Sequence, residues 1–191
     1  SVVWIKEKYD LDVITLTVDL GAGPEIEGVR EKSKSAGAID SVVIDAKDEF
    51  VNEYIFPALK SGGMYEDVYA LSTALARPLM SKKIVETARK YGAEYVSHGC
   101  TGKGNDQVRL ELTFMALDPS LTIVAPWKDP NWTLHSREDC IAYADERNIP
   151  ISQSKKRIYS EDRNIWHISH EGGELENPSK EPSDDVYTLS S

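Results

Sequence analysis

A glycine-rich stretch, HGCTGKGNDQVR at residues 98–109, sets the strongest limit on how this chain folds. A short apolar run at residues 95–97 precedes it, and Val108, Leu112 and Met115 recur after it at helical spacing. This order predicts a strand, a tight turn and a helix. Three glycines within residues 99–104 allow the backbone to approach a ligand closely.

The residues around this turn favour a bound anion. Asp106 is placed to cap the helix, and the free N–H groups of a first helical turn attract negative charge. Lys103 and Arg109 add positive charge on either side. The stretch is not a Walker loop, because Asn105 follows Gly104 where that pattern needs Lys. The alternative is an ordinary helix-capping loop with incidental charge.

Strand and helix patterns alternate along the chain. Apolar runs at residues 12–18, 41–44, 95–97 and 122–125 predict buried strands. Helices are expected at residues 1–9, 25–36, 48–59 and 73–91, and a capping box at 136–139 begins another that runs through Asp145. The alternation predicts an α/β fold in which a doubly wound parallel sheet carries helices on both faces.

Composition changes at about Gln153, so two domains are expected, at residues 1–152 and 153–191. Glycine, proline, serine and charge dominate the second part, and composition alone predicts an irregular surface extension there. His167 and His170 do not indicate a metal site, because further ligands at metal-binding spacing are lacking.

Charge and hydropathy exclude several classes of protein. The net charge of −10 argues against nonspecific binding to nucleic acid. No long apolar segment and no signal-peptide pattern occur, so the cytosol is the expected compartment. Cys100 and Cys140 do not make a disulfide framework, and Cys100 is expected to be a small loop residue rather than a nucleophile.

The residues themselves carry a more specific signal, because residues 98–109 resemble the signature loop of the argininosuccinate synthase family. Its members are ATP-dependent ligases that join citrulline to aspartate. Further stretches resemble the same family in the same order: TVDLG at 17–21, YIFPA at 54–58, YEDVY at 65–69, TALARP at 73–78, APW at 125–127 and NIWH at 164–167. The resemblance implies an adenine nucleotide α-hydrolase-like, Rossmann-like fold followed by the start of a synthetase domain.

The resemblance also implies roles for individual residues. Contacts to ATP are expected from Val18, Ser97, His98, Gly99, Cys100, Thr101, Gly102, Lys103, Gly104 and Asn105. Contacts to citrulline and aspartate are expected from Tyr69, Thr73, Ala74, Arg77, Thr101, Asn105, Asp106, Arg109, Ser160, Ser169 and Glu171. Asp106 and Arg109 are the expected catalytic residues, and Mg²⁺ is expected to bridge the phosphates of ATP.

The function implied is ligation of citrulline and aspartate to argininosuccinate, with release of AMP and pyrophosphate, in a cytoplasmic homotetramer. In the family, a strand and a Ser-Gly-Gly-Leu-Asp-Thr-Ser loop precede the position of Ser1, and a further C-terminal part follows. The chain is therefore expected to be a fragment of such a ligase. The alternatives are a nucleotide- or citrulline-binding module without turnover and another member of the ATP pyrophosphatase group.

Overall fold

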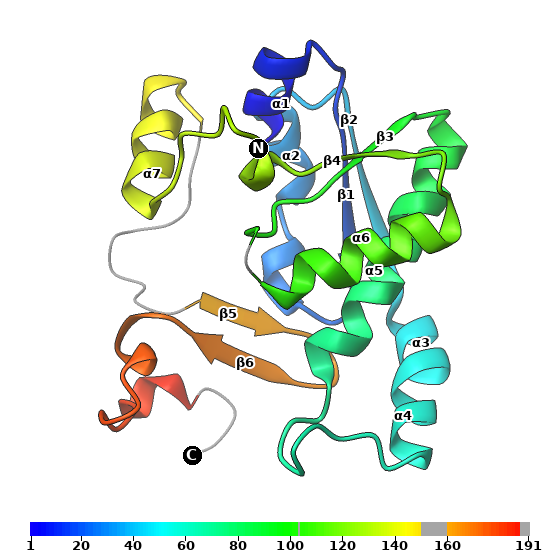
Figure 1. The fold of residues 1–191 in the computed structure, drawn as a ribbon, viewed down its shortest axis with the longest axis vertical. Helices are drawn as coiled ribbons and strands as arrows, with labels where there is room; N and C mark the ends of the chain where they lie inside the picture. The colour runs from blue at the N-terminus through cyan, green and yellow to red at the C-terminus, as the bar shows by residue number, and fades with distance from the viewer. Residues whose placement is uncertain (103, 150–159, 188–191) are drawn as a thin grey trace.

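The computed structural model describes residues 1–102, 104–149 and 160–187 of the chain (Figure 1). Its helices are α1 (Val2–Tyr9), α2 (Val29–Ser35), α3 (Lys47–Phe50), α4 (Phe56–Lys60), α5 (Ser72–Tyr91), α6 (Asn105–Leu117) and α7 (Arg137–Glu146). Its strands are β1 (Ile14–Asp19), β2 (Asp40–Asp45), β3 (Tyr95–Ser97), β4 (Thr122–Val124), β5 (Ser160–Arg163) and β6 (Ile168–Glu171). The α/β alternation expected from the sequence is confirmed.

The parallel strands form two pairs, whereas the sequence predicted one continuous sheet. β1 pairs with β2 and β3 pairs with β4, both in parallel register. Each pair is joined through a helix, as a parallel connection requires. β5 and β6 form a separate antiparallel hairpin, which lies below the four parallel strands in Figure 1.

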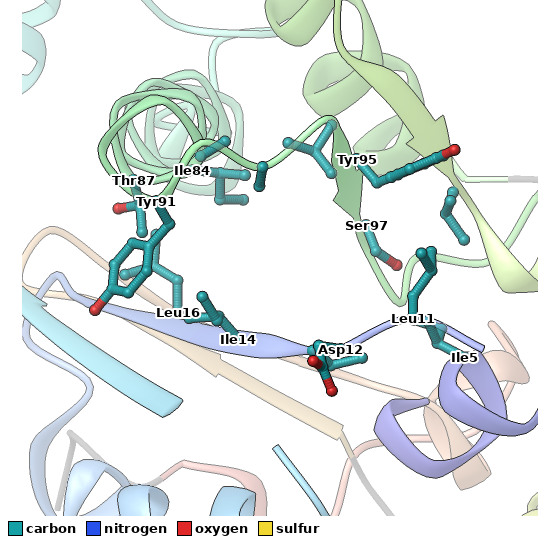
Figure 2. Close-up of a pocket in the computed structure, with 15 residues that line it drawn as sticks. Ile5, Leu11, Asp12, Ile14, Leu16, Ile84, Thr87, Tyr91, Tyr95 and Ser97 are labelled. Atoms are coloured by element: carbon teal, nitrogen blue, oxygen red, sulfur yellow. The ribbon is translucent and has the colours of Figure 1, made fainter. Parts of the chain in front are cut away.

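A cavity of about 200 Å³ separates the two parallel pairs. Figure 2 shows Ile14 and Leu16 of β1 on one side of it and Ser97 of β3 on the other, and Tyr95 also lines it. α5 closes a third side through residues that include Ile84. Among the described residues, no strand joins β1 to β3, so the two pairs are separate sheets.

The long helix α5 connects two hydrophobic clusters. Near its start, Ala76 and Leu79 pack with Phe50 beside β1 and β2. Further along, Val85 packs with residues of β3 and α6 that include Phe114. Apolar burial at both ends therefore fixes α5 against both strand pairs.

Two expected helices begin or continue differently from the prediction. The segment predicted at residues 25–36 contains a 3₁₀ turn and the shorter helix α2, because Gly28 adopts a positive φ of 71° just before it. The segment predicted at 48–59 begins at Lys47, without a side-chain cap from Asp48. A π-helical turn, Val51–Ile55, then joins α3 to α4, which fits the missing N–H of Pro57 just beyond it.

The remaining elements follow local sequence signals. The capping box is confirmed, because the hydroxyl of Ser136 accepts from the Asp139 N–H while Asp139 accepts from the Ser136 N–H. The irregular extension expected from composition is wrong for the β5–β6 hairpin. Among the described residues, no helix combines the length and apolarity needed to cross a bilayer.

The hairpin packs against the parallel core through the loop between its strands. The Ile165 N–H donates to the Leu20 carbonyl at 2.7 Å, and the Trp166 indole N–H donates to the Ala70 carbonyl at 2.7 Å. Asn164 is buried and its side-chain oxygen accepts from the Trp166 and His167 N–H groups. These contacts fix the hairpin beside the carboxyl end of β1 and the start of α5. The irregular surface extension predicted from composition would not make such contacts.

Candidate functional site

A cleft of about 790 Å³ lies where the start of α5, the glycine-rich turn with the start of α6, and the β5–β6 hairpin meet. The turn follows the carboxyl end of β3, where ligands collect in α/β sheets. The residues lining the cleft are Tyr69, Thr73, Arg77, Gly99, Cys100, Thr101, Gly104, Asn105, Asp106, Gln107, Arg109, Glu161, Asp162, Ser169 and Glu171. Three segments that are distant in sequence therefore build one site.

Arg77 links two of these segments. Its guanidinium donates to the Asp106 carboxylate at 2.9 Å and to Asp162 of β5 at 2.6 Å. Burial acts to lower the pKa of Arg77, but Asp162 and Asp106 outweigh it and raise the pKa. The guanidinium stays charged, and a substrate carboxylate must compete with these two carboxylates for it.

Asp106 accepts from two arginines rather than capping the helix. Arg109 donates to its Oδ1 at 2.8 Å, and Arg77 donates to its Oδ2. α6 begins at Asn105, and its N-cap, Gly104, makes no side-chain capping bond. The expected cap at Asp106 is therefore wrong, since the helix starts two residues earlier than such a cap requires and the two guanidiniums hold the carboxylate. The first-turn N–H groups of α6 lack a side-chain cap and suit an anion.

The buried side chain of His98 holds the start of the turn. His98 is buried, and the Cys100 N–H donates to its Nδ1 at 3.3 Å. Burial and the nearby Asp106 carboxylate raise the pKa of the Cys100 thiol. A raised pKa disfavours the thiolate, which fits the expected role of Cys100 as a loop residue rather than an activated nucleophile.

Other lining residues come from the start of α5 and from the hairpin. The Tyr69 hydroxyl accepts from the Thr73 N–H at 2.9 Å, which satisfies one free donor of the first turn of α5. The Thr73 hydroxyl donates to Asp162 at 3.2 Å. Ser169 and Glu171 lie on β6, whose register pairs Glu171 with Ser160 of β5.

Most of the expected site residues line this cleft. They are Tyr69, Thr73, Arg77, Gly99, Cys100, Thr101, Gly104, Asn105, Asp106, Arg109, Ser169 and Glu171. The described residues that do not line it are Val18, Ala74, Ser97, His98 and Gly102. Val18 packs in the hydrophobic cluster with Leu20, and Ser97 lines the cavity between β1 and β3. Lys103 lies outside the described residues, as does the side chain of Ser160.

The sequence argument missed three lining residues: Gln107, Glu161 and Asp162. The side-chain oxygen of Gln107 is buried and has no hydrogen-bond partner among the described residues. Such an oxygen is able to accept from a ligand N–H. Glu161 and Asp162 precede the NIWH motif, and an acidic pair in that position was the available signal.

The cleft does not fit a protein-held metal ion. Both carboxylate oxygens of Asp106 are engaged by guanidiniums. Within the described ranges, no group of three or more His, Cys, Asp or Glu side chains has the arrangement of a metal site. No chemical step is therefore assigned to a metal that the protein holds.

A core of parallel strand pairs joined through helices is Rossmann-like. Residues 1–150 match a family model described as "Arginosuccinate synthase N-terminal HUP domain", which gives the class of this domain. The chain belongs to the argininosuccinate synthase family. It is 54% identical over 189 residues to "Argininosuccinate synthase" of Idiomarina loihiensis, which covers 98% of this chain and 46% of that protein.

Other relatives give the same result. The chain is 53% identical over 186 residues to "Argininosuccinate synthase" of Carboxydothermus hydrogenoformans, covering 97% of this chain and 46% of that protein. It is 50% identical over 190 residues to "Argininosuccinate synthase, chloroplastic" of Arabidopsis thaliana, covering 99% and 38%. The chain therefore spans less than half the length of these curated relatives.

Proposed function

We propose that this protein takes part in the ATP-dependent ligation of L-citrulline and L-aspartate to argininosuccinate. The ureido oxygen of citrulline attacks the α-phosphorus of ATP, and pyrophosphate leaves. The aspartate amine then attacks the ureido carbon of the citrullyl-adenylate, loses a proton, and displaces AMP. Such chemistry requires positioning and charge stabilisation more than a nucleophilic side chain.

The observation that carries the proposal is the mixed charge of the cleft. Two guanidiniums, of Arg77 and Arg109, lie among the carboxylates of Asp106, Glu161, Asp162 and Glu171. Amino-acid substrates are zwitterions, so their ammonium groups suit carboxylates and their carboxylates suit guanidiniums. Arg109 makes one ion pair with Asp106 among the described residues and is the more available of the two guanidiniums.

The hairpin and the turn then divide the substrates between them. Ser169 and Glu171 lie on the hairpin and suit the amino-acid end of citrulline. Thr101, Asn105 and Asp106 suit aspartate, and Asn105 and Arg109, which line the same cleft, also suit citrulline. The Gln107 oxygen, which has no hydrogen-bond partner within the described ranges, suits an N–H group of either substrate.

The nucleotide phosphates suit the glycine-rich turn and the uncapped first turn of α6. Magnesium is proposed to arrive on the phosphates of ATP, since the residues of the cleft do not form a metal-binding set. The family further implies a homotetramer in the cytoplasm, and both statements belong to this proposal.

A pyrophosphate-release assay tests the proposal. The chain is incubated with MgATP and aspartate, with and without citrulline. Release of pyrophosphate only when citrulline is present is the expected result. Arg109→Ala should lower the rate about 100-fold or more, because it removes a charged donor from the reacting groups.

Citrulline-independent release contradicts the ligase assignment. Citrulline binding detected by calorimetry, with no pyrophosphate formed, identifies instead a binding module without turnover. Arg89→Ala is the matched control. Arg89 lies in the last turn of α5, where it pairs with Asp118 and does not line the cleft.

A further inference from the structure

A buried ion network lies behind the glycine-rich turn, and His98 is its one member among the expected site residues. Glu111 of α6 is 9% exposed, yet it carries a carboxylate. Its Oε1 lies 3.0 Å from His98 Nε2, and Lys128 donates to its two oxygens at 3.0 and 2.9 Å. A buried carboxylate is costly unless it is paired, and these partners supply the pairing.

The hydrogen bonds fix the tautomer of His98. Its Nδ1 accepts from the Cys100 N–H at 3.3 Å, so Nδ1 carries no proton. Its Nε2 therefore carries the proton and donates to Glu111 at 3.0 Å. Burial acts to raise the pKa of Glu111, but Lys128 and His98 outweigh it and lower the pKa.

Three separate segments meet in this network. His98 follows β3 directly, Glu111 lies on α6, and Lys128 ends the 3₁₀ turn Pro126–Lys128 after β4. The stem of Lys128 also lies against the turn, because a Cβ added at Gly102 would lie 3.3 Å from Lys128 Cγ. The network thus holds the turn at its entry, through Cys100, and near its middle, at Gly102.

We propose that Glu111 is a positioning residue: through His98 and Lys128 it fixes the path of the glycine-rich turn over the cleft. None of these three side chains lines the cleft, so Glu111 acts through the backbone of the turn. This inference rests on the proposed function only for its consequence, which is that the fixed turn sets the affinity for ATP.

Amide hydrogen exchange and ¹⁵N NMR of the full chain test the positioning role without any ligand. In the wild type, His98 is expected as the Nε2–H tautomer and the Cys100 amide is expected to be protected. Glu111→Gln should mix the tautomers and speed exchange at Cys100 about tenfold or more. The same signals unchanged in a folded Glu111→Gln protein overturn the proposal.

The matched control is Glu49→Gln. Glu49 also pairs with two lysines, Lys82 and Lys83, at 2.7 and 2.6 Å, but it lies on α3 away from the turn. It should leave exchange at Cys100 unchanged. If Glu111→Gln does not fold, Lys128→Met replaces it, because the Lys128 side chain is 44% exposed and its replacement is expected to disturb the core less. Faster exchange at Gly102 and Cys100 is then expected, and unchanged exchange overturns the proposal.

An ATP titration separates this inference from the proposed function. Glu111→Gln should weaken MgATP binding about tenfold, whereas Glu49→Gln should leave it unchanged. A wild-type chain that does not bind MgATP contradicts the nucleotide part of the proposed function, and the exchange result then decides the positioning role alone. Equal MgATP affinity in the wild type and Glu111→Gln overturns the stated consequence.

Discussion

At the scale of single residues, Arg77 shows how two carboxylates are accommodated close together in the cleft, because its guanidinium pairs with both. Its side chain is 18% exposed and lies between Asp106 and Asp162, whose side chains are 29% and 36% exposed. Without the guanidinium, two carboxylates would face each other in a partly buried space. Arg77 therefore joins the hairpin to α6 and stabilises the cleft before any substrate binds.

Replacing Arg77 should cost more stability than replacing an exposed arginine on the same helix. We expect Arg77→Gln to lower the free energy of unfolding by about 1–3 kcal/mol, because it removes the charged partner of Asp162 and leaves Asp106 with Arg109 alone. Arg89→Gln should cost less than about 1 kcal/mol, since the Arg89 side chain is 55% exposed. Urea titration at pH 7 measures both, and equal losses would show that the Arg77 pairs do not stabilise the fold.

Sequence reasoning found the residues of this site better than it found their partners. Residue identity in the motifs located Arg77, Asp106 and Arg109, and all three line the cleft. It did not reveal that Asp162 pairs with Arg77 across 85 positions of sequence, because periodicity carries no information about such long-range contacts.

At the scale of elements, α6 shows the limit of hydrophobic spacing. Val108, Leu112 and Met115 predicted the helix correctly, but they are 45%, 61% and 53% exposed. The buried face instead carries Leu110 and Phe114. Helical spacing identifies a helix, but it does not say which face is buried when a helix such as α6 has two apolar stripes. The face with charged Glu111 is buried because His98 and Lys128 satisfy the carboxylate, which spacing cannot reveal.

The turn after β1 should control how the hairpin packs. Gly21 has a φ of +96°, and a Cβ added there would lie 2.8 Å from the Ile165 backbone nitrogen. Gly21→Ala should therefore cost about 1–3 kcal/mol through strain and a backbone clash. Hydrogen exchange in the loop at residues 164–167 should rise with it.

Gly23→Ala separates the clash from the strain. Gly23 also has a positive φ, +73°, but a Cβ there would meet no described atom within 4 Å. It should destabilise the chain without raising exchange in the loop between β5 and β6. Equal exchange there in both variants would mean that Gly21 does not hold the hairpin.

The contact between α1 and α7 should weaken at high pH. The Tyr143 hydroxyl donates to Glu7 at 2.7 Å, and burial followed by this bond raises the pKa of Tyr143 from 10 to about 12. The folded state therefore holds this proton more tightly than the unfolded state does. The contribution of this hydrogen bond to the free energy of unfolding is complete below pH 10 and is lost as the pH rises toward 12.

Tyr143→Phe tests this linkage. At pH 8 it should lower the free energy of unfolding by about 1 kcal/mol, the usual value of a hydrogen bond. The difference from the wild type should shrink between pH 10 and pH 12. Denaturant titrations at several pH values measure it, and a difference that stays constant through this range contradicts the assigned cause.

At the scale of the whole molecule, the cleft exists only because three parts of the chain come together. Residues 69–77, 99–109 and 161–171 each supply lining side chains. The alternation of strands and helices predicted the α/β class, but it did not predict the hairpin, whose apolar residues are isolated in a polar segment. Hairpin docking depends on single contacts, such as that of Trp166 with Ala70, which composition does not encode.

If these segments form one site, a ligand should protect all of them together. We expect citrulline to slow amide exchange at 69–77, 99–109 and 161–171 in parallel, with one concentration dependence for the three. At about 100 times its Kd, it should also raise the free energy of unfolding by about 2.7 kcal/mol.

Exchange mass spectrometry during a citrulline titration measures the protection, and a thermal scan measures the stability. Protection of the glycine-rich turn alone would mean that the hairpin does not contribute to binding. Protection of all three with a single midpoint is expected because Arg77 joins α5, α6 and β5 through its two carboxylate partners.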